Sequence, residues 1–209
     1  MLNLNKTNLI KFSNTNLTYL DSIKPFHKDQ WNITIKAMKS VKEKIKKDLI
    51  LIQNNKCAYC IKDLDDRTRS DDDLQLDGDR EHIAPKSIHP EFMFEELNLV
   101  LSCAVCNRTL KNDIDVISRK NTSYSRCDFN IVHPYLDNYK KHIVFDTDMV
   151  ICTGYITTKG LTTINLFKLN ESYITKERAK THALKNNIKL EKEIEDLKKQ
   201  VAYYKEKTI

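Results

Sequence analysis

Apolar residues recur every three or four positions after His27, and lysines fill many of the positions between them. The apolar set is Trp31, Ile35, Met38, Val41, Ile45, Leu49 and Ile52. This spacing is typical of an amphipathic helix that buries one face. It predicts a helix from about His27 to Asn54 that leads directly into Cys57.

A second helical pattern covers residues 171–207. Within it, the spacing alternates between four and three residues at Leu190, Ile194, Leu197, Val201 and Tyr204. That is a heptad seam of about two repeats. So short a seam fits a tail helix packed on its own domain as well as a helix that joins a partner or a second copy of the chain.

Shorter patterns lie around and between these helices. The first 25 residues are polar, rich in Asn and weakly patterned, and the segment after Cys60 is acidic and turn-like. We expect an extended segment over 74–83, a strand over 97–101, a short helix over 104–112, and short strands or turns over 131–145 and 149–166.

The composition excludes some classes of function. Only three glycines occur among 209 residues, so no glycine-rich phosphate loop can be written and we expect no nucleotide hydrolysis. No apolar run approaches the length of about 18 residues that a membrane span needs. The first residues also lack the apolar region of a secretory signal. We therefore expect a cytoplasmic protein without membrane association.

The net charge changes sign along the chain. Residues 1–56 carry +7, residues 57–113 carry −6 and residues 114–209 carry +5, which gives +6 overall. Basic arms of this kind suit a polyanion such as nucleic acid, and the acidic centre suits a cation. For any single lysine, a solvated helix face remains the simpler explanation.

Four of the six cysteines form two C-x-x-C pairs, Cys57 with Cys60 and Cys103 with Cys106. In a reducing compartment, paired cysteines are more often metal ligands than disulfides. Two pairs can close a tetrahedral Zn²⁺ site, and four thiolates leave no open coordination position. We therefore expect a structural zinc that clips together the ends of a 42-residue insert. The other two cysteines, Cys127 and Cys152, are expected to be ordinary buried or semi-buried thiols. His133 is expected to be a histidine that packs a loop, with a role in a second site as the alternative.

The insert and its flanks carry the pattern C-x-Y-C, E-H-I-x-P-K and N-L-V-L-x-C-x-x-C-N-x-x-x-K over residues 57–111. This pattern resembles the HNH endonuclease family in its four-cysteine zinc form. The resemblance implies an α+β fold, a ββα-metal (HNH) finger stapled by the zinc and embedded in mainly helical N- and C-terminal elements. It divides the chain into an N-terminal segment (1–56), the zinc-stapled nuclease core (57–113), a mixed extension that packs on the core (114–170) and a C-terminal helix (171–209).

The HNH resemblance implies catalytic roles for three residues. His82 matches the family's first histidine, which implies a general base, because a neutral imidazole near pH 7 can take a proton from water. Asn98 matches the middle asparagine, which ties the loop backbone and orients the base. Asn107 matches the third residue, often a histidine, which implies a ligand of a divalent ion through its amide oxygen. The motif is thus His-Asn-Asn rather than His-Asn-His.

The same resemblance implies a carboxylate ligand for a catalytic Mg²⁺ or Mn²⁺ ion. Glu81 stands where family members often have Asp. Neighbouring residues of a strand point to opposite faces, so Glu81 and His82 serve one site only at a strand end or bulge, and Asp79 and Asp77 are rivals. Three further residues are candidates for contacts to substrate phosphates, with ordinary surface charge as the alternative: Lys86, Arg108 and Lys111.

A looser resemblance connects the flanking segments with HNH proteins of bacterial anti-phage defence operons, which include the Septu-type (PtuB-like) nuclease subunit and its retron-associated relatives. The resemblance rests on three segments: the predicted helix that contains Trp31, residues His133 to Asn138, and residues Leu166 to Arg178. It implies a nuclease effector that cuts DNA or RNA, such as tRNA, together with an ABC-type ATPase. The alternative is a non-catalytic zinc-binding adaptor that holds nucleic acid or a partner, for which His82 and Asn107 are dispensable.

Overall fold

Helix α2 (Lys36–Gln53) buries the apolar stripe that the sequence predicts, in a computed structural model that describes residues 4–64 and 78–207. Met38, Val41 and Ile45 have no exposed surface. The prediction of one helix from His27 is wrong, because Trp31 lies in a separate 3₁₀ turn, η1 (Lys28–Asn32), and Ile35 is extended. Two of the three residues between the turn and the helix are isoleucines and the third is a threonine, and β-branched residues of this kind disfavour a continuous helix.

A helix that the sequence pattern missed precedes this region. Helix α1 (Asn14–Ser22) is capped by Ser13, whose side chain accepts a hydrogen bond from the backbone N–H of Asn16 at 3.2 Å. Helix α1 packs against α2. Its buried face is narrow, with Asn16 and Leu20 as the buried residues, so its stability depends on the cap and on α2 more than on an apolar stripe.

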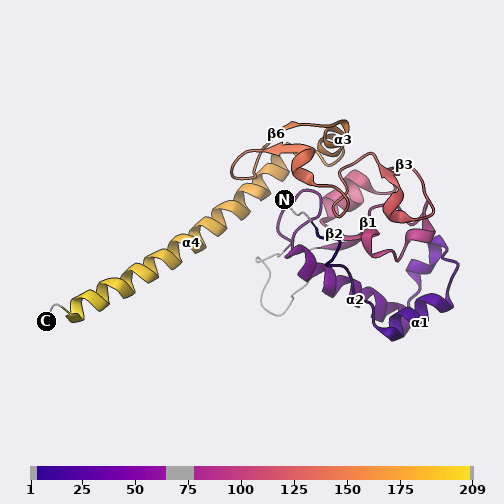
Figure 1. Ribbon diagram of the computed structural model, residues 1–209, viewed down its shortest axis with the longest axis horizontal. Helices are drawn as coiled ribbons and strands as arrows, with labels where there is room; N and C mark the ends of the chain where they lie inside the picture. Colours follow the sequence, from indigo (N-terminus) through magenta and orange to yellow (C-terminus); the bar gives the residue numbers. More distant parts are fainter. Residues whose placement is uncertain (1–3, 65–77, 208–209) are drawn as a thin grey trace.

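The centre of the protein is a pair of antiparallel strands followed by a helix (Figure 1). Strand β1 (Asp79–His82) pairs with β2 (Leu99–Ser102), and the chain then forms the π-helix η4 (Val105–Lys111). The predicted strand over 97–101 begins later, because residues 96–98 form a 3₁₀ turn, η3 (Glu96–Asn98). Part of the predicted extended segment, residues 74–77, lies outside the described residues.

The side chain of Gln53 hydrogen-bonds to the backbone of β2 at the groups that β1 does not pair. Its amide oxygen accepts from Leu101 N–H at 2.6 Å, and its amide nitrogen donates to the Leu101 carbonyl at 3.0 Å. The Ala58 N–H donates to the same carbonyl at 3.0 Å. The end of α2 and the first cysteine pair are thereby attached to the central strands.

The later part of the chain adds small elements around this centre. Strands β3 (Ile117–Arg119) and β4 (Asp128–Phe129) form one antiparallel pair, and β5 (Ile143–Phe145) and β6 (Cys152–Tyr155) form another. Helix α3 (Thr158–Leu166) occupies part of a segment for which strands or turns were expected. Thr157 caps α3 by accepting from the Gly160 N–H at 3.1 Å. Short 3₁₀ turns make up much of the rest: η2 (Pro90–Phe92), η5 (Tyr124–Arg126) and η6 (Tyr139–Lys141).

One hydrophobic cluster includes residues from Leu4 to Ile174. Helix α4 (Ser172–Lys207) begins at this cluster and extends away from it. The prediction of a helix over 171–207 is confirmed. Its first turns pack on the body through Ile174 and Arg178, each 3% exposed. The rest projects far from the body, as Figure 1 shows. Within the described residues, no helix has both the length and the apolar character required to cross a membrane.

Candidate functional site

The two cysteine pairs come together as predicted. The four Sγ atoms of Cys57, Cys60, Cys103 and Cys106 all lie within 4.8 Å of one another, and all four side chains are buried. A Zn–S bond of about 2.3 Å places tetrahedral sulfurs ~3.8 Å apart. The Sγ atoms of Cys60 and Cys103 are 3.8 Å apart, so this pair has the spacing of two ligands of a tetrahedral zinc site, and the other sulfurs lie close enough to complete it.

The chemistry of this cluster also favours a cation. Contacts with neighbouring thiols, Cys103 first among them, together with burial raise the pKa of Cys60 well above its ordinary value. Packed thiols of this kind become four thiolates together only when a positive ion balances them. Backbone N–H groups already point at the sulfurs, with Cys103 N at 3.4 Å from Cys57 Sγ and Cys106 N at 3.5 Å from Cys103 Sγ. The site fits a structural zinc, and all its ligand positions are filled by sulfur.

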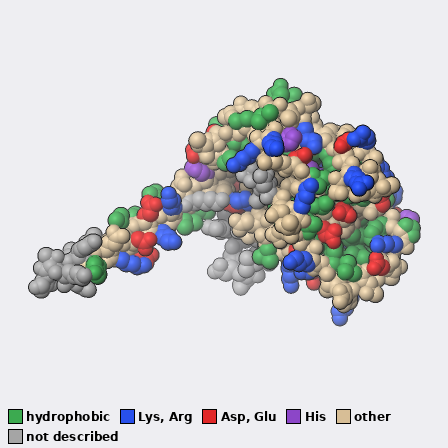
Figure 2. Space-filling model, viewed as in Figure 1, with side chains coloured by type: hydrophobic (Ala, Val, Ile, Leu, Met, Phe, Trp, Pro, Cys, Tyr) green, Lys and Arg blue, Asp and Glu red, His purple; other side chains and the backbone are tan. Residues whose placement is uncertain are grey.

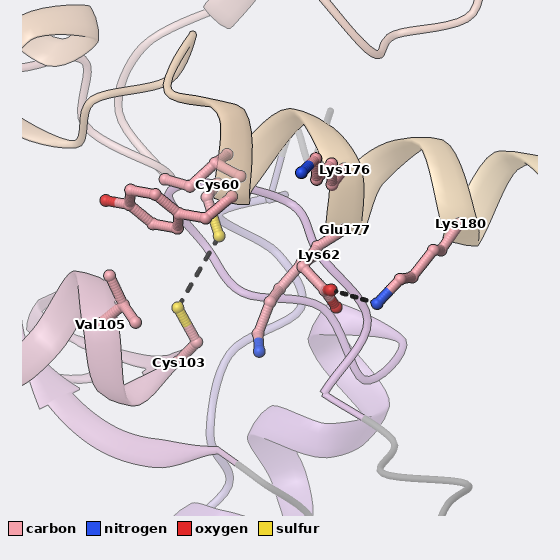
Figure 3. A pocket seen from close by; sticks show the side chains of 9 residues that line it. Cys60, Lys62, Cys103, Val105, Lys176, Glu177 and Lys180 are labelled. Carbon is pink, nitrogen blue, oxygen red and sulfur yellow. Dashed lines mark hydrogen bonds and ion pairs between the residues drawn. The ribbon is translucent and has the colours of Figure 1, made fainter.

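Helix α4 begins directly over the four-cysteine cluster. A cavity of about 260 Å³ lies between Cys60, Cys103 and the first turns of α4 (Figure 3). Lysines 62, 176 and 180 line it, and Glu177 pairs with Lys180 at 2.7 Å. With a zinc ion bound, four thiolates would outnumber the charge of the ion, and the lysines around this cavity would offset the excess negative charge.

His82 ends strand β1 with its ring buried, 5% exposed. The Nε2 atom lies 3.1 Å from the Met93 carbonyl. Since a carbonyl only accepts, Nε2 carries the proton, and Nδ1 keeps the lone pair. The edge of the ring meets Trp31, with centroids 4.4 Å apart. Burial, with Lys86 and Lys111 nearby, lowers the pKa of His82 to about 3, so the ring is neutral near pH 7.

Asn98 is fully buried and ties three parts of the chain together. Its amide nitrogen donates to the carbonyls of Ala84 at 3.2 Å and Phe92 at 2.9 Å. Its oxygen accepts from the Ala84 N–H at 2.6 Å. Phe92 directly precedes Met93, whose carbonyl holds His82. These are bonds of the kind expected for the middle asparagine of the motif.

Two residues that the motif did not include support Asn98. The Tyr124 hydroxyl donates to Asn98 Oδ1 at 2.9 Å and lies 3.0 Å from His133 Nε2. His133 Nδ1 accepts from the N–H groups of Tyr135 and Leu136, both at 3.2 Å. Nε2 of His133 is therefore the protonated nitrogen and donates to Tyr124. The packing role expected for His133 thus includes a hydrogen-bond chain from His133 through Tyr124 to Asn98.

Glu81 and Lys111 form a buried ion pair, with Lys111 Nζ 2.8 Å from Glu81 Oε1. The same Nζ donates to the His82 carbonyl at 2.9 Å. Burial raises the pKa of Glu81, and Lys111 opposes the shift. Lys111 has no exposed surface. The prediction that it contacts a substrate phosphate or lies on the surface is therefore wrong, since a buried ammonium is retained here by a buried carboxylate.

Asp79 lies beside Asn107 at the start of β1. Asn107 Nδ2 donates to Asp79 Oδ2 at 3.3 Å, and Arg108 binds both Asp79 oxygens at 2.7 and 2.8 Å. The side chain of Arg108 is 70% exposed, and its contact with a substrate phosphate stays a prediction. Among the candidate carboxylates, Asp79 contacts Asn107 while Glu81 contacts Lys111. Asp77 lies outside the described residues.

The predicted site residues therefore form two contact groups joined by β1. The His82 ring contacts Trp31 and Met93, and the Asn107 amide contacts Asp79. Lys111 belongs to the His82 side through its bonds to Glu81 and to the His82 carbonyl, and among the described residues it makes no bond to Asp79 or Asn107. Sequence reasoning missed the parts played by Trp31 and Tyr124, whose position beside the site depends on the tertiary structure. Lys86 is half-buried and near enough to His82 to influence its pKa.

Comparison with known proteins adds one relationship. No family model matches the chain. The chain is similar to Septu protein PtuB of Bacillus thuringiensis, with 29% identity over 127 residues, which is 61% of this chain and 41% of that protein. The chain thus spans less than half the length of that relative. The similarity supports a Septu-like protein, built here around a four-cysteine metal site.

Proposed function

We propose that this chain is a metal-dependent endonuclease of the HNH type, which hydrolyses phosphodiester bonds of DNA or RNA as an effector of anti-phage defence. The observation that carries the proposal is the state of His82. One ring nitrogen is committed to the Met93 carbonyl at 3.1 Å, and burial holds the pKa at about 3. A neutral imidazole with one fixed lone pair can take a proton from water, and its strength as a base depends on the negative charge of a bound phosphate raising its pKa toward the working pH.

The surroundings of His82 support precise positioning of that base. Asn98 fixes the loop from Ala84 to Phe92 at both of its ends through hydrogen bonds of 2.6 to 3.2 Å. The next residue, Met93, has no exposed surface and holds the His82 ring. A base held on a rigid, buried frame loses little entropy when it meets a water molecule, which favours proton transfer.

The oxygen atoms near η4 suit a hard divalent ion such as Mg²⁺ or Mn²⁺. Asp79 and Asn107 are the pair that the contacts favour. The Asn107 amide nitrogen donates to Asp79 and Arg108 binds both Asp79 oxygens, so an ion would have to displace these bonds to reach the carboxylate and the amide oxygen. Glu81 joins them only if its bond to Lys111 is released. Carboxylate and amide oxygens are the donors that Mg²⁺ prefers. A bound ion of this kind supplies charge stabilisation at the scissile phosphate.

The protein's own groups then divide the work of hydrolysis. His82 Nδ1 accepts a proton from the attacking water while Nε2 stays on the Met93 carbonyl. The imidazolium that forms is costly in a buried position, and the negative charge of the scissile phosphate offsets part of that cost. Arg108, exposed and held by Asp79, is in a position to bind a neighbouring phosphate.

The defence role rests on the similarity to Septu protein PtuB. A nuclease of this kind depends on a partner, for which we propose an ABC-type ATPase encoded beside it. Since this chain has only three glycines and no phosphate-binding loop, nucleotide sensing falls to that partner.

The test is a cleavage assay of the complex that co-purifies with the chain from its native operon. Plasmid DNA and total tRNA are incubated with Mg²⁺ or Mn²⁺, and EDTA serves as the metal-free control. We expect metal-dependent cleavage of at least one substrate, and a loss of at least ~100-fold in rate for His82→Ala.

His89→Gln is the matched control, because His89 is also buried but pairs with Asp115 at 2.9 Å, outside the site. The His89 variant should cleave at the parental rate. Equal cleavage by the His82 variant would refute the assigned base. Nucleic-acid binding without cleavage by the parental complex would favour the zinc-binding adaptor instead.

A further inference from the structure

We propose that helix α4 (Ser172–Lys207) joins two copies of this chain in a parallel, two-stranded coiled coil over residues 187–204. The inference concerns the projecting part of α4 and does not depend on the nuclease activity.

The projecting part of α4 exposes an apolar face that its own body leaves uncovered. Among the described residues, the last ion pair between α4 and the body is His182 with Asp148 at 3.5 Å. The ion pairs further along, Lys189–Glu193 at 3.6 Å and Lys199–Glu195 at 3.0 Å, join residues of α4 itself. Leu190, Ile194 and Leu197 are 55%, 51% and 58% exposed. Figure 2 shows hydrophobic side chains lying between charged ones along this part of the helix.

The type of residue at each heptad position points to two strands. With Ile194 at position a, the a positions are Asn187, Ile194 and Val201, and the d positions include Leu190 and Leu197. β-branched residues at a with leucine at d favour parallel dimers over higher oligomers, and a single asparagine at a fixes the register. The chain has all three features within 15 residues.

The polar positions favour a parallel partner of the same sequence. Glu193 occupies position g, and Lys198 occupies the following e position. A parallel pair therefore brings Glu193 next to the Lys198 of the second copy, and the reciprocal contact forms by symmetry. The Asn187 amide meets the same amide of the second copy and finds a hydrogen-bond partner. In an antiparallel pair, position a faces position d, and this amide would lose that matching partner.

A parallel coil places both bodies at the same end. Each body then presents its zinc cluster and its candidate site from one side of the stalk. Because the seam is only about two and a half heptads long, we expect a micromolar rather than a nanomolar dimer.

The first test is the mass of the full chain by sedimentation equilibrium at concentrations from about 1 µM to ~200 µM, a range that brackets a micromolar affinity. We expect a rise from the 24.5 kDa monomer toward twice that mass. Ile194→Asp should remove the rise. Ile188→Asp is the matched control, because Ile188 is equally exposed, 50% against 51%, but lies at position b. The control variant should dimerise like the parent.

The second test fixes the orientation. Asn187→Cys should form an interchain disulfide under mild oxidation, whereas Glu195→Cys, at position b, should not. The parental chain, whose six cysteines are all buried, gives the background. A monomer at every concentration, or equal effects of Ile194→Asp and Ile188→Asp, would overturn the proposal. The apolar face of α4 would then be a candidate binding site for another protein. A dimer in which Asn187→Cys gives no interchain crosslink would overturn the parallel arrangement.

Discussion

The Tyr124 hydroxyl is the centre of the buried chain that supports Asn98, and its removal is a sensitive test of that chain. Tyr124 is 2% exposed. Its hydroxyl donates to Asn98 Oδ1 at 2.9 Å and accepts from His133 Nε2 at 3.0 Å. Tyr124→Phe keeps the ring and its packing, so it changes the hydrogen bonds alone.

The two partners of the hydroxyl respond differently to its loss. Asn98 Oδ1 keeps the bond from the Ala84 N–H at 2.6 Å. His133 has no exposed surface, and its Nε2–H loses its acceptor. One unsatisfied buried donor costs about 1–3 kcal/mol. We therefore expect the free energy of unfolding to fall by about 2 kcal/mol, which lowers Tm by roughly 4–8 °C in a chain of this size.

The assay is urea unfolding followed by far-ultraviolet circular dichroism in zinc-containing buffer. Tyr19→Phe is the matched control, because the Tyr19 hydroxyl is buried and has no hydrogen-bond partner among the described residues. That variant should be as stable as the parent or slightly more stable. A Tyr124 variant within about 0.5 kcal/mol of the Tyr19 variant would refute the chain from His133 to Asn98.

Further measurements test other parts of the structure. Chelation of the metal, or Cys103→Ser, should unfold the centre of the protein, and a zinc-free chain with an unchanged circular dichroism spectrum would contradict a structural zinc. Lys111→Met should cost about 3–5 kcal/mol in urea unfolding, because it leaves Glu81 buried without its partner, and adding Glu81→Leu should restore most of the loss. Burial lowers the pKa of His133 from 6.5 to about 3 in the folded protein, so its contribution is complete above pH 6.5 and is lost as the pH falls toward 3. The pKa of His82 is lowered to about 3 in the same way, so each pH unit below 6.5 should cost up to about 1.4 kcal/mol in the free energy of unfolding for each of the two histidines. Equal urea midpoints at pH 7 and pH 5 for the parent, or an unchanged pH dependence in His133→Gln, would contradict this.

The candidate site was predicted in part from short motifs. The two C-x-x-C pairs predicted the metal cluster, because a chelating turn is local and its spacing is visible in the sequence. Asn98 bonds to the loop backbone, as the motif suggests, and its role in orienting a base stays a prediction. The motif gave no sign of Tyr124 and an incorrect position for Lys111, since a lysine in an acidic, polar segment resembles a surface residue until its buried partner is known.

The amino-acid sequence by itself determined the helical faces of α2 and α4 and the cysteine cluster. These features depend on periodicity and on local spacing, which report the face of each residue. Only the tertiary structure decided which carboxylate Lys111 neutralises and which hydroxyl supports Asn98. Each of these depends on groups that lie far apart along the chain, 26 residues in the case of Asn98 and Tyr124. A buried polar group must find its partner wherever the packed chain places one, and no local pattern encodes that choice.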